Sequence, residues 1–367
     1  MSSHALPAEV DGGIEQLIHN ALAPQVEAID QGAFPGDFLR AFGALGGFAA
    51  ALPAESGGLG LGLPAQIDLI ARVARTCGTT GFLAWCQAAC AWYLQLSPNP
   101  EVRARYLAQV AQGQLLAGTG MSNVVKHLAG IEQINLRGHR DGQGYRISGA
   151  LPWVSNLGAG HLLIAAAALD DGTYVMFAIP PGAEGYSLRA CPAFSGLEGS
   201  ATYGVRLKNV FVPAADVLST PEQFDAYVRR FKAGFLLLQI GIGAGLVQAS
   251  LDTIQKANQR LDHVNRYLDD QADTLRGDLD TLLAQTAALA EQEESAPLLG
   301  ILRARAQGSE LSLRATQSAA LHAGAAGYLM SSPTQRRLRE ALFVAIVTPA
   351  LKHLRKEIHA LEQRQAA

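Results

Sequence analysis

The sequence has few cysteines and little net charge. Its 367 residues include four cysteines, Cys77, Cys86, Cys90 and Cys191, too few for a disulfide framework in a chain of this length. Lys and Arg total 29 against 32 Asp and Glu, a formal net charge of -3. A chain without excess positive charge offers no general attraction to phosphate backbones or anionic membranes. We therefore expect reduced thiols, no nucleic acid partner and no membrane partner.

We also expect no targeting segment and no membrane span. Residues 1–16 contain no basic stretch followed by an apolar core, so we expect no signal or transit peptide and a cytoplasmic protein. The most apolar run, residues 234–249, is shorter than the ~20 residues that a membrane span needs and is rich in glycine. This run predicts a buried helix.

The hydrophobic pattern divides the chain into three parts. Apolar residues make up 49% and charged residues 17%, which is typical of a globular protein. Apolar residues recur at helical spacing over 1–115, short β-branched or aromatic runs fill 116–213, and longer helical patterns fill 214–367. We predict an α+β fold with an N-terminal helical domain, a middle antiparallel β-barrel or sandwich, and a C-terminal four-helix bundle.

Individual elements follow from the same pattern. A glycine-rich loop over 57–62 precedes a helix that starts near Pro64. The predicted strands are 133–140, 145–148, 162–167 and 174–179, and the predicted C-terminal helices are 223–260, 267–294, 298–321 and 334–364.

Most catalytic patterns are missing. Cys86 and Cys90 are one helical turn apart, but no second ligand pair accompanies them, so we interpret them as buried thiols and predict no metal site. The loop 57–62 has no strand before it and no Lys-Ser or Lys-Thr after it, which argues against a phosphate-binding loop. Without a Gly-x-Ser-x-Gly or His-Glu-x-x-His pattern, hydrolase functions also lose support.

The segment 152–158 combines a large aromatic residue with a hydroxyl at the end of an expected strand. The face of Trp153 can cover a planar heterocycle, and the hydroxyl of Ser155 can donate to one of its ring nitrogens. The same residues are equally consistent with a core tryptophan beside a turn.

Four motifs occur in order along the chain. They are Pro-x-x-x-Gly-Gly-x-Gly at 53–60, Gly-Thr-Gly-Met-Ser-Asn at 118–123, Trp-Val-Ser-Asn at 153–156, and the pair of stretches 194–200 and 207–213. In this order they resemble the acyl-CoA dehydrogenase superfamily of flavoproteins, and the resemblance covers almost the whole chain. It implies an FAD whose ring lies between the β domain and the C-terminal bundle.

The resemblance assigns cofactor contacts to individual residues. It implies contacts from Met121 and Ser122 through backbone and hydroxyl, from Trp153 through its ring, and from Ser155 near the redox-active nitrogen. A donor placed there favours flavin reduction, because it lies where negative charge develops.

The adenine-diphosphate half of FAD has weaker counterparts. Of the family's Arg-x-x-Phe-Gly motif only Arg260 remains, one place out of register, and the family's Gln-x-x-Gly-Gly-x-Gly is reduced to residues 321–327 with Gly324. A glycine such as Gly324 also commonly ends a helix.

The family's carboxylate base is missing from both of its usual positions. By the resemblance these positions fall near Phe235 and near Thr348, and neither 229–246 nor 341–351 contains Asp or Glu. The catalytic residue therefore stays unassigned by the sequence.

Three functions remain open. The first is flavin-dependent α,β-dehydrogenation of an acyl thioester. The second is a two-component monooxygenase of the same fold, using O2 and reduced FMN or FAD supplied by a reductase; the stretch 331–336 resembles such relatives, and His263, His322 and His353 are candidate proton donors by residue type. The third is a non-catalytic flavin- or ligand-binding protein.

The partners follow from the resemblance as well. It implies a small-molecule substrate such as acyl-CoA, an electron-transfer or reductase partner, and a homodimer or homotetramer. Gly241, Gly243 and Gly245 predict close helix packing, either between subunits or within one.

Overall fold

The N-terminal third folds into helices packed around a central one. The structure, a computed structural model, describes residues 5–366. Its first helices are α1 (Ala8–Leu17), α2 (Val26–Asp30), α3 (Gly36–Ala44), α4 (Gly62–Thr76), α5 (Gly78–Leu96) and α6 (Pro100–Ala111). α5 is apolar on nearly all sides and is buried by its neighbours. Cys86 and Cys90 are buried free thiols within it, as predicted, and burial raises the pKa of both.

The loop before α4 requires glycine. Gly57 and Gly60 have φ of +79° and +67°, and a Cβ at Gly58 would lie 2.1 Å from the carbonyl oxygen of Leu52. Only glycine adopts this backbone without strain. α4 begins at Gly62, two residues before the predicted start at Pro64.

The middle third forms a sheet domain. Its elements are β1 (Ala117–Thr119), α7 (Ser122–Leu128), β2 (Arg137–Asp141), β3 (Gly144–Val154), β4 (Leu162–Leu169), β5 (Tyr174–Ile179), β6 (Tyr186–Ala190), β7 (Tyr203–Pro213) and β8 (Val217–Ser219). The strand order is β6-β7-β3-β2-β4-β5-β8, and β1 pairs with β4. The expected antiparallel pairing is wrong for two pairs, because β1 and β2 each run parallel to β4. The strands β1, β6, β7 and β8 and the helix α7 were not among the individual elements predicted from the sequence pattern.

Strand β4 joins the sheet to the helices. All of its residues are buried, and they alternate between two cores. Leu162 and Ile164 pack into the main core shared with the helices, whereas Leu163 and Ala165 pack into a second core inside the sheet domain. A strand covered on both faces reads as a continuous apolar run, which is why this segment is Leu-Leu-Ile-Ala-Ala-Ala-Ala-Leu.

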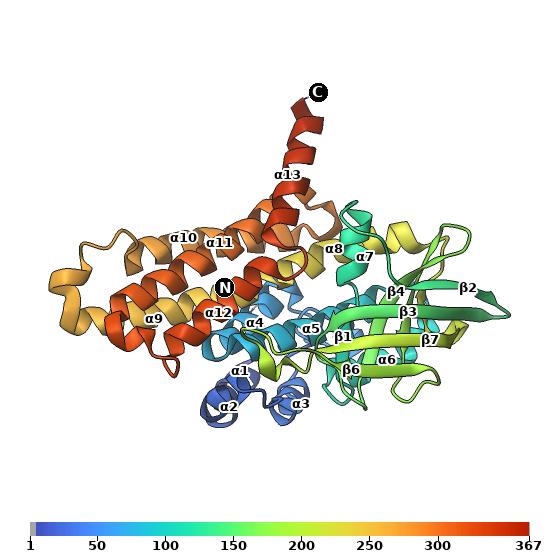
Figure 1. The fold of residues 1–367 in the computed structure, drawn as a ribbon, viewed down its shortest axis with the longest axis horizontal. Coiled ribbons are helices and arrows are strands. Elements are labelled where there is room, and N and C mark those ends of the chain that lie inside the picture. The colour runs from blue at the N-terminus through green and yellow to red at the C-terminus, as the bar shows by residue number, and fades with distance from the viewer. Residues whose placement is uncertain (1–4, 367) are drawn as a thin grey trace.

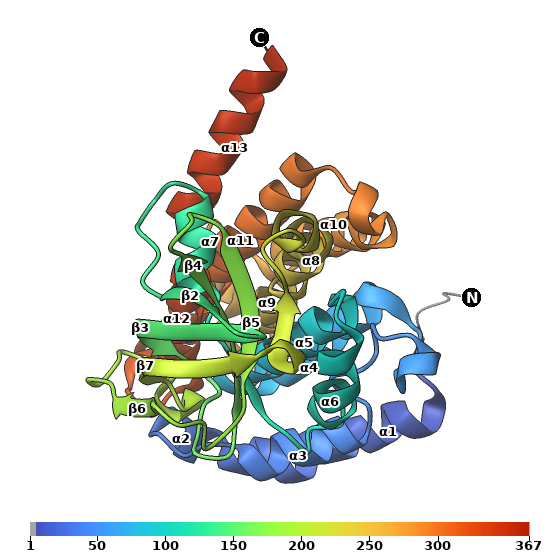
Figure 2. The same ribbon diagram turned by 90° about the vertical axis from the view of Figure 1, so that its right-hand side faces the viewer.

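The last third is helical and elongated. Its helices are α8 (Phe224–Leu238), α9 (Ile240–Asn265), α10 (Ala272–Glu291), α11 (Leu298–Ala323), α12 (Pro333–Ile346) and α13 (Leu351–Ala366). α9 to α12 pack side by side at one end of the molecule, the sheet lies at the other, and α13 projects from the body (Figures 1 and 2). The three-part fold class predicted from the sequence is confirmed.

The single helix predicted over 334–364 is wrong. α12 ends at Ile346, and α13 begins only at Leu351. Pro349 explains the break, because proline lacks a backbone N–H and disfavours helical geometry in the residue before it. Val347 and Thr348 consequently leave the helix and line a cavity.

The predicted helix over 223–260 is divided at Gln239 into α8 and α9. The combined segment Phe224–Asn265 is long and apolar enough to cross a membrane by length and composition, but its most apolar window is 94% buried inside the protein. This burial agrees with the buried helix expected over 234–249.

The glycines of α9 serve packing within one chain. A Cβ would lie 2.6 Å from a carbonyl oxygen of α4 at Gly241 and 2.3 Å from another at Gly245. Gly243 faces Gly308 of α11, whose carbonyl oxygen would be 3.0 Å from an added Cβ. Of the two expectations for these glycines, the close approach inside the subunit is the one observed.

We predict that Gly245→Ala destabilises the protein by about 1–3 kcal/mol, because its methyl group would collide with the backbone of α4. The matched control is Gly277→Ala in α10, where no atom lies within 4 Å of the added Cβ. Removing that helical glycine should stabilise by about 0.5–1 kcal/mol. Thermal unfolding of both variants measures the difference, and equal melting temperatures would contradict this account of the contact.

Candidate functional site

A cavity of about 420 Å³ lies where the three parts of the chain meet. α5 contributes Phe82, Trp85 and Cys86, and the end of β1 with α7 contributes Thr119, Gly120, Ser122, Asn123 and Lys126. The remaining lining residues come from the end of β3, the loop 194–202, Glu132, Phe235 of α8, and the end of α12 with the two residues after it.

One side of the cavity is aromatic. The rings of Phe82 and Trp85 stack at 5.7 Å, and Phe343 of α12 meets Phe82 edge to face at 4.6 Å. Phe235 of α8 lies 5.3 Å from Trp85, whose Nε1 donates to the Phe235 carbonyl oxygen at 3.4 Å. These contacts join α5, α8 and α12 around an apolar space suited to a hydrocarbon chain or a flat ring.

Trp153 is exposed at the edge of this space. The β3–β7 register shifts between Leu151 and Val154, so a β-bulge occurs there. Val154 stays in the sheet core, whereas the Trp153 side chain is 60% exposed and lines the cavity. Bulges re-aim side chains next to sites. Of the two alternatives for Trp153, the core tryptophan is therefore wrong, and an indole face remains exposed.

Three hydroxyls lie beside Trp153. Ser155 Oγ and Thr202 Oγ1 are 2.6 Å apart, and Ser200 Oγ and Thr202 Oγ1 are 2.7 Å apart. All three residues line the cavity. Because each hydroxyl both donates and accepts, this row of three hydroxyls can donate one hydrogen bond to a ligand while the hydrogen bonds between its members remain formed.

The turn after Ser155 is held from both sides. Asn156 is fully buried with φ of +58°, and its Nδ2 donates to Gln87 Oε1 (3.1 Å) and to the Ala117 carbonyl oxygen (2.8 Å). Leu197 and Ala201, in the facing loop, also have left-handed φ angles of +62° and +46°. Left-handed non-glycine residues cost energy and cluster at functional sites.

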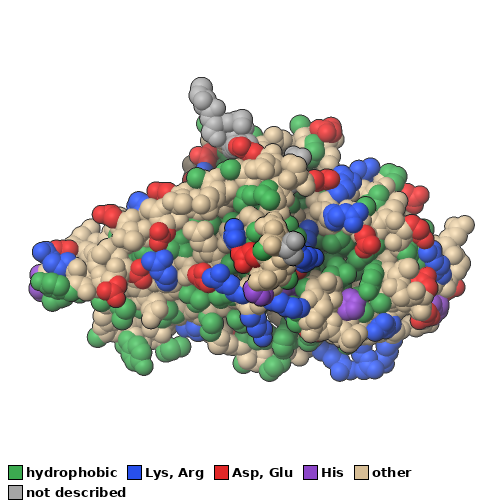
Figure 3. Space-filling model, turned by 90° about the horizontal axis from the view of Figure 1, so that it is seen from above, with side chains coloured by type: hydrophobic (Ala, Val, Ile, Leu, Met, Phe, Trp, Pro, Cys, Tyr) green, Lys and Arg blue, Asp and Glu red, His purple; other side chains and the backbone are tan. Residues whose placement is uncertain are grey.

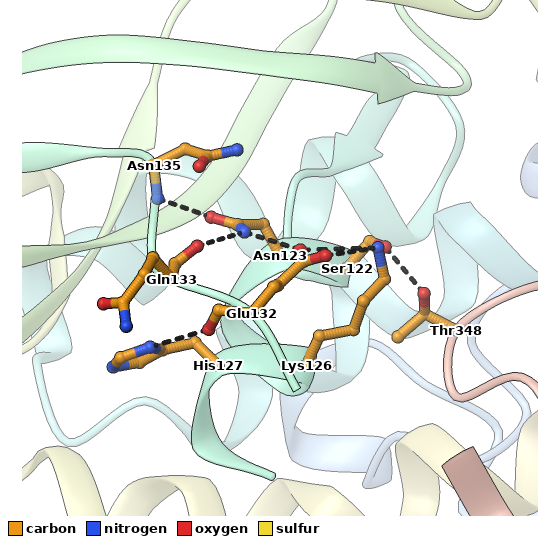
Figure 4. Close-up of polar contacts among 8 residues, drawn as sticks. All are labelled: Ser122, Asn123, Lys126, His127, Glu132, Gln133, Asn135 and Thr348. Atoms are coloured by element: carbon orange, nitrogen blue, oxygen red, sulfur yellow. Dashed lines mark hydrogen bonds and ion pairs between the residues drawn. The ribbon is translucent and has the colours of Figure 1, made fainter. Parts of the chain in front are cut away.

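The opposite side of the cavity is polar. Ser122 Oγ at the start of α7 and Thr348 Oγ1 after α12 are hydrogen-bonded at 2.7 Å. Figure 4 shows the two hydroxyls pointing toward each other from separate segments. Thr348 reaches this position because the helix is broken at Pro349.

Glu132 lies next to this pair. Its carboxylate accepts from Asn123 Nδ2 at 2.7 Å and is 3.2 Å from Lys126 Nζ (Figure 4). Asn123 Oδ1 in turn accepts from the backbone N–H of Asn135 at 2.7 Å, which fixes the amide. Among the lining residues in the described part of the chain, Glu132 is the one carboxylate.

Sequence reasoning missed most of this polar side. Lys126 and Glu132 are six residues apart on a short helix and the irregular segment after it, so no periodic pattern relates them. The aromatic residues Phe82, Trp85 and Phe343 were visible only as helix-core positions. An early signal was Pro349, which would have placed Thr348 in a loop.

The structure separates the predicted cofactor residues into groups. Trp153, Ser155 and Ser122 line the cavity, whereas the Met121 side chain is buried beside it in the main core. Arg260, near the end of α9, and Gly324, after α11, are at the far end of the bundle, where Asn265 Nδ2 donates to the His322 carbonyl oxygen at 3.2 Å.

The candidate proton donors do not reach the cavity. None of His263, His322 and His353 is among its lining residues in the described chain. His322 Nδ1 contacts the Ser318 carbonyl oxygen at 2.9 Å inside the bundle, and His353 Nε2 is 3.7 Å from Glu357. The structure therefore does not bring these three histidines to this cavity.

Comparisons with known proteins agree with this architecture. The family model for the acyl-CoA dehydrogenase N-terminal domain matches residues 9–114. A probable acyl-CoA dehydrogenase, YngJ of Bacillus subtilis, is 25% identical over 356 residues, covering 91% of each chain.

Solved structures show the same fold. Butyryl-CoA dehydrogenase from Megasphaera elsdenii has a TM-score of 0.84 at 17% identity, covering 98% of this chain and 99% of that one. A glutaryl-CoA dehydrogenase from Mycobacterium smegmatis in complex with FADH2 has a TM-score of 0.80 at 16% identity, covering 99% and 96%. The N-terminal third of this chain thus matches the acyl-CoA dehydrogenase family model, and the whole chain has the fold of these solved acyl-CoA dehydrogenases.

Proposed function

We propose that the cavity binds the ring of a flavin against Trp153 and oxidises an acyl thioester beside it. The observation that carries this proposal is an indole that is 60% exposed at the edge of the cavity, next to the linked hydroxyls of Ser155 and Thr202. Because Trp153 lines the cavity, its exposed face is placed where a flat ligand can stack on it. The relatives named as acyl-CoA dehydrogenases support the substrate class.

The lining residues fit the ring of FAD. A flat heterocycle needs an aromatic face, apolar contacts and a few donors at its polar edge, and Trp153, Leu151 and Ser155 offer these groups. When bound, the flavin supplies the hydride acceptor of the reaction.

The aromatic side fits an acyl chain. Phe82, Trp85, Phe235 and Phe343 exclude water from the space between α5, α8 and α12. A dry space strengthens each polar contact made inside it. These residues therefore orient the substrate and keep solvent away from the reacting carbons.

Proton removal from the α-carbon requires a base, and Glu132 is the carboxylate available. Asn123 and Lys126 hold its oxygens in place. Phe235 and the residues Ile346, Val347 and Thr348, which surround the family's usual base positions, line the cavity without an acid. We propose that Glu132 takes the proton in this chain.

A second candidate function is favoured by the lack of an acid at these described lining positions. With Phe235 and Thr348 near the positions where, by the resemblance, an acyl-oxidising relative would carry a base, the site also suits a monooxygenase that uses O2 and reduced FMN or FAD from a reductase. Such a reaction needs a dry pocket rather than a base above a thioester. The two functions require different electron partners, an electron acceptor for the first and a reductase for the second.

We further propose a homodimer or homotetramer in the cytoplasm. Large apolar side chains are exposed near the far end of the bundle, including Tyr267 (82%), Tyr328 (83%) and Met330 (73%). Exposed apolar patches commonly mark protein contacts. The free thiols support a reducing compartment.

Trp153→Ala tests the ring site. We expect the variant to bind FMN about ten-fold more weakly, because loss of aromatic stacking and buried area costs about 1–2 kcal/mol. Titration calorimetry with FMN measures the affinity. Phe211→Ala, which removes an exposed ring from the distant end of β7, is the matched control and should bind FMN normally. Equal affinity of the two variants would remove the basis of the proposal.

Ser155→Ala tests the hydroxyl. The variant should fold and bind flavin, but acyl-CoA should bleach the bound flavin on the order of ten-fold more slowly, since a hydrogen bond to developing charge contributes about 1–3 kcal/mol. Anaerobic stopped-flow absorbance gives this rate. Ser187→Ala, on the exposed strand β6, is the control. An unchanged rate in Ser155→Ala would rule out the assigned role.

Glu132→Gln distinguishes the two functions. If Glu132 is the base, the variant should lose about 10²-fold or more in the rate of flavin bleaching by acyl-CoA while flavin affinity stays the same. Glu184→Gln, an exposed acid of the sheet domain, serves as control. Should the unaltered protein show no bleaching but consume O2 with a substrate when reduced flavin is supplied, the monooxygenase function replaces the first.

A further inference from the structure

We infer that the outer face of β6, β7 and β3 binds the diphosphate group of a nucleotide ester whose other end enters the cavity. A shallow groove of about 750 Å³ crosses this face. We call it the basic groove, because its charged lining residues are Arg189, Arg206 and Lys208. The inference rests on the proposed function, in which a flavin ring and an acyl thioester occupy the cavity.

Strand register brings the three cations onto one face. Arg206 of β7 lies opposite Ala150 of β3 on one side and opposite Ser187 of β6 on the other. Lys208 follows two residues later and so points to the same side, while Arg189 pairs with Gly204. The side chains of all three cations are exposed.

Small residues form the floor between these cations. Ser148, Gly149 and Ala150 of β3 and Gly204 of β7 line the groove. Short side chains leave the charged groups room to converge on a ligand lying along the strands. They also leave backbone close to the surface, as sites that hold phosphate groups often do.

The cations of the basic groove lack counter-charges. Within residues 5–366, no carboxylate oxygen lies within ion-pair distance of Arg189, Arg206 or Lys208. Elsewhere on the same domain, Arg140 pairs with Glu222 and Arg146 with Asp141, each at 2.7 Å. Like charges on neighbouring strands repel one another. Three neighbouring cations without acidic partners are therefore suited to bind an anionic ligand.

The diphosphate is the anion that matches two arginines and a lysine. Guanidinium groups bind phosphate oxygens in pairs, and an ammonium adds a point charge. Lys and Arg side chains gather at the sheet end of the molecule, at the lower right of Figure 3. Because the whole chain has a net charge of -3, this excess of positive charge is local to one face.

The basic groove is continuous with the cavity. Leu151 and Pro152 line both, and the β-bulge at 151–154 turns Trp153 outward at their junction. Along β3, Trp153 and Ala150 are three residues apart, which is ~10 Å of strand. A ligand whose ring contacts Trp153 can therefore extend its chain toward Arg206.

Two ligands of the proposed reaction carry a diphosphate ester. FAD has one beyond its ribityl chain, and CoA has one beyond its pantetheine arm. FMN, riboflavin and pantetheine lack it. Comparing FAD with riboflavin, and CoA with pantetheine, separates binding of the diphosphate from binding of the ring end or the thiol end. Comparing FAD with CoA shows which of the two ligands uses the basic groove.

The test is titration calorimetry with FAD, riboflavin, CoA and pantetheine on the full chain and on the double variant Arg189→Gln/Arg206→Gln. We expect the double variant to lose about ten-fold or more in affinity for FAD, for CoA or for both, with riboflavin and pantetheine unchanged. The affinity lost should shrink as salt concentration rises, because the contacts are ionic. Arg276→Gln, an exposed cation of α10, is the control.

The outcomes separate the inference from the proposed function. A selective loss for FAD assigns the basic groove to the flavin, and a selective loss for CoA assigns it to the substrate; either supports the inference. Unchanged affinity for both FAD and CoA, with circular dichroism showing an intact fold, overturns it and leaves ring binding standing. If riboflavin and FAD both fail to bind the unaltered protein, the flavin proposal fails, and the CoA titration still decides the basic groove.

Discussion

The buried amide of Gln87 ties the site together. Its nitrogen donates to the carbonyl oxygens of Val110 (2.8 Å) and Leu115 (2.9 Å), and its oxygen accepts from the Ala117 N–H (2.8 Å) and from Asn156 Nδ2 (3.1 Å). With no exposed surface, this side chain cannot be satisfied by water, so its partners must stay in place. One residue of α5 thereby fixes the end of the helical domain, the start of β1 and the turn that carries Ser155 and Trp153.

How much of this site was predictable depends on the range of the interactions involved. The order helix, sheet, helix and the buried thiols of α5 follow from periodicity, which is local. Trp153 and Ser155 could be selected because both belong to one short motif, Trp-Val-Ser-Asn at 153–156. The β-bulge that exposes Trp153 depends on pairing with β7, and Glu132 reaches the cavity through Asn123 and Lys126, so neither could be derived from spacing.

The errors of the sequence prediction have equally physical causes. One proline was overlooked in an otherwise helical pattern, and that residue decides that Thr348 lies in the cavity rather than on a helix. The glycines of α9 permit close approach to any partner, and only the fold shows that the partners are α4 and α11 of the same chain. Local propensity indicates which secondary structures a segment can adopt. Tertiary contacts determine which elements it packs against.

Net charge and local charge answer different questions about ligands. A total of -3 argues against a long polyanion, because such a partner samples the field of the whole surface. A diphosphate is only a few ångströms long. At ordinary ionic strength, salt screens it from acidic groups that are more than about 10 Å away. Three cations on one sheet face, with their acids elsewhere, can therefore attract a small phosphate ester to a protein that is acidic overall. The sheet then contributes both ends of the ligand site: an aromatic face at the bulge of β3 and positive charge farther along the same strands.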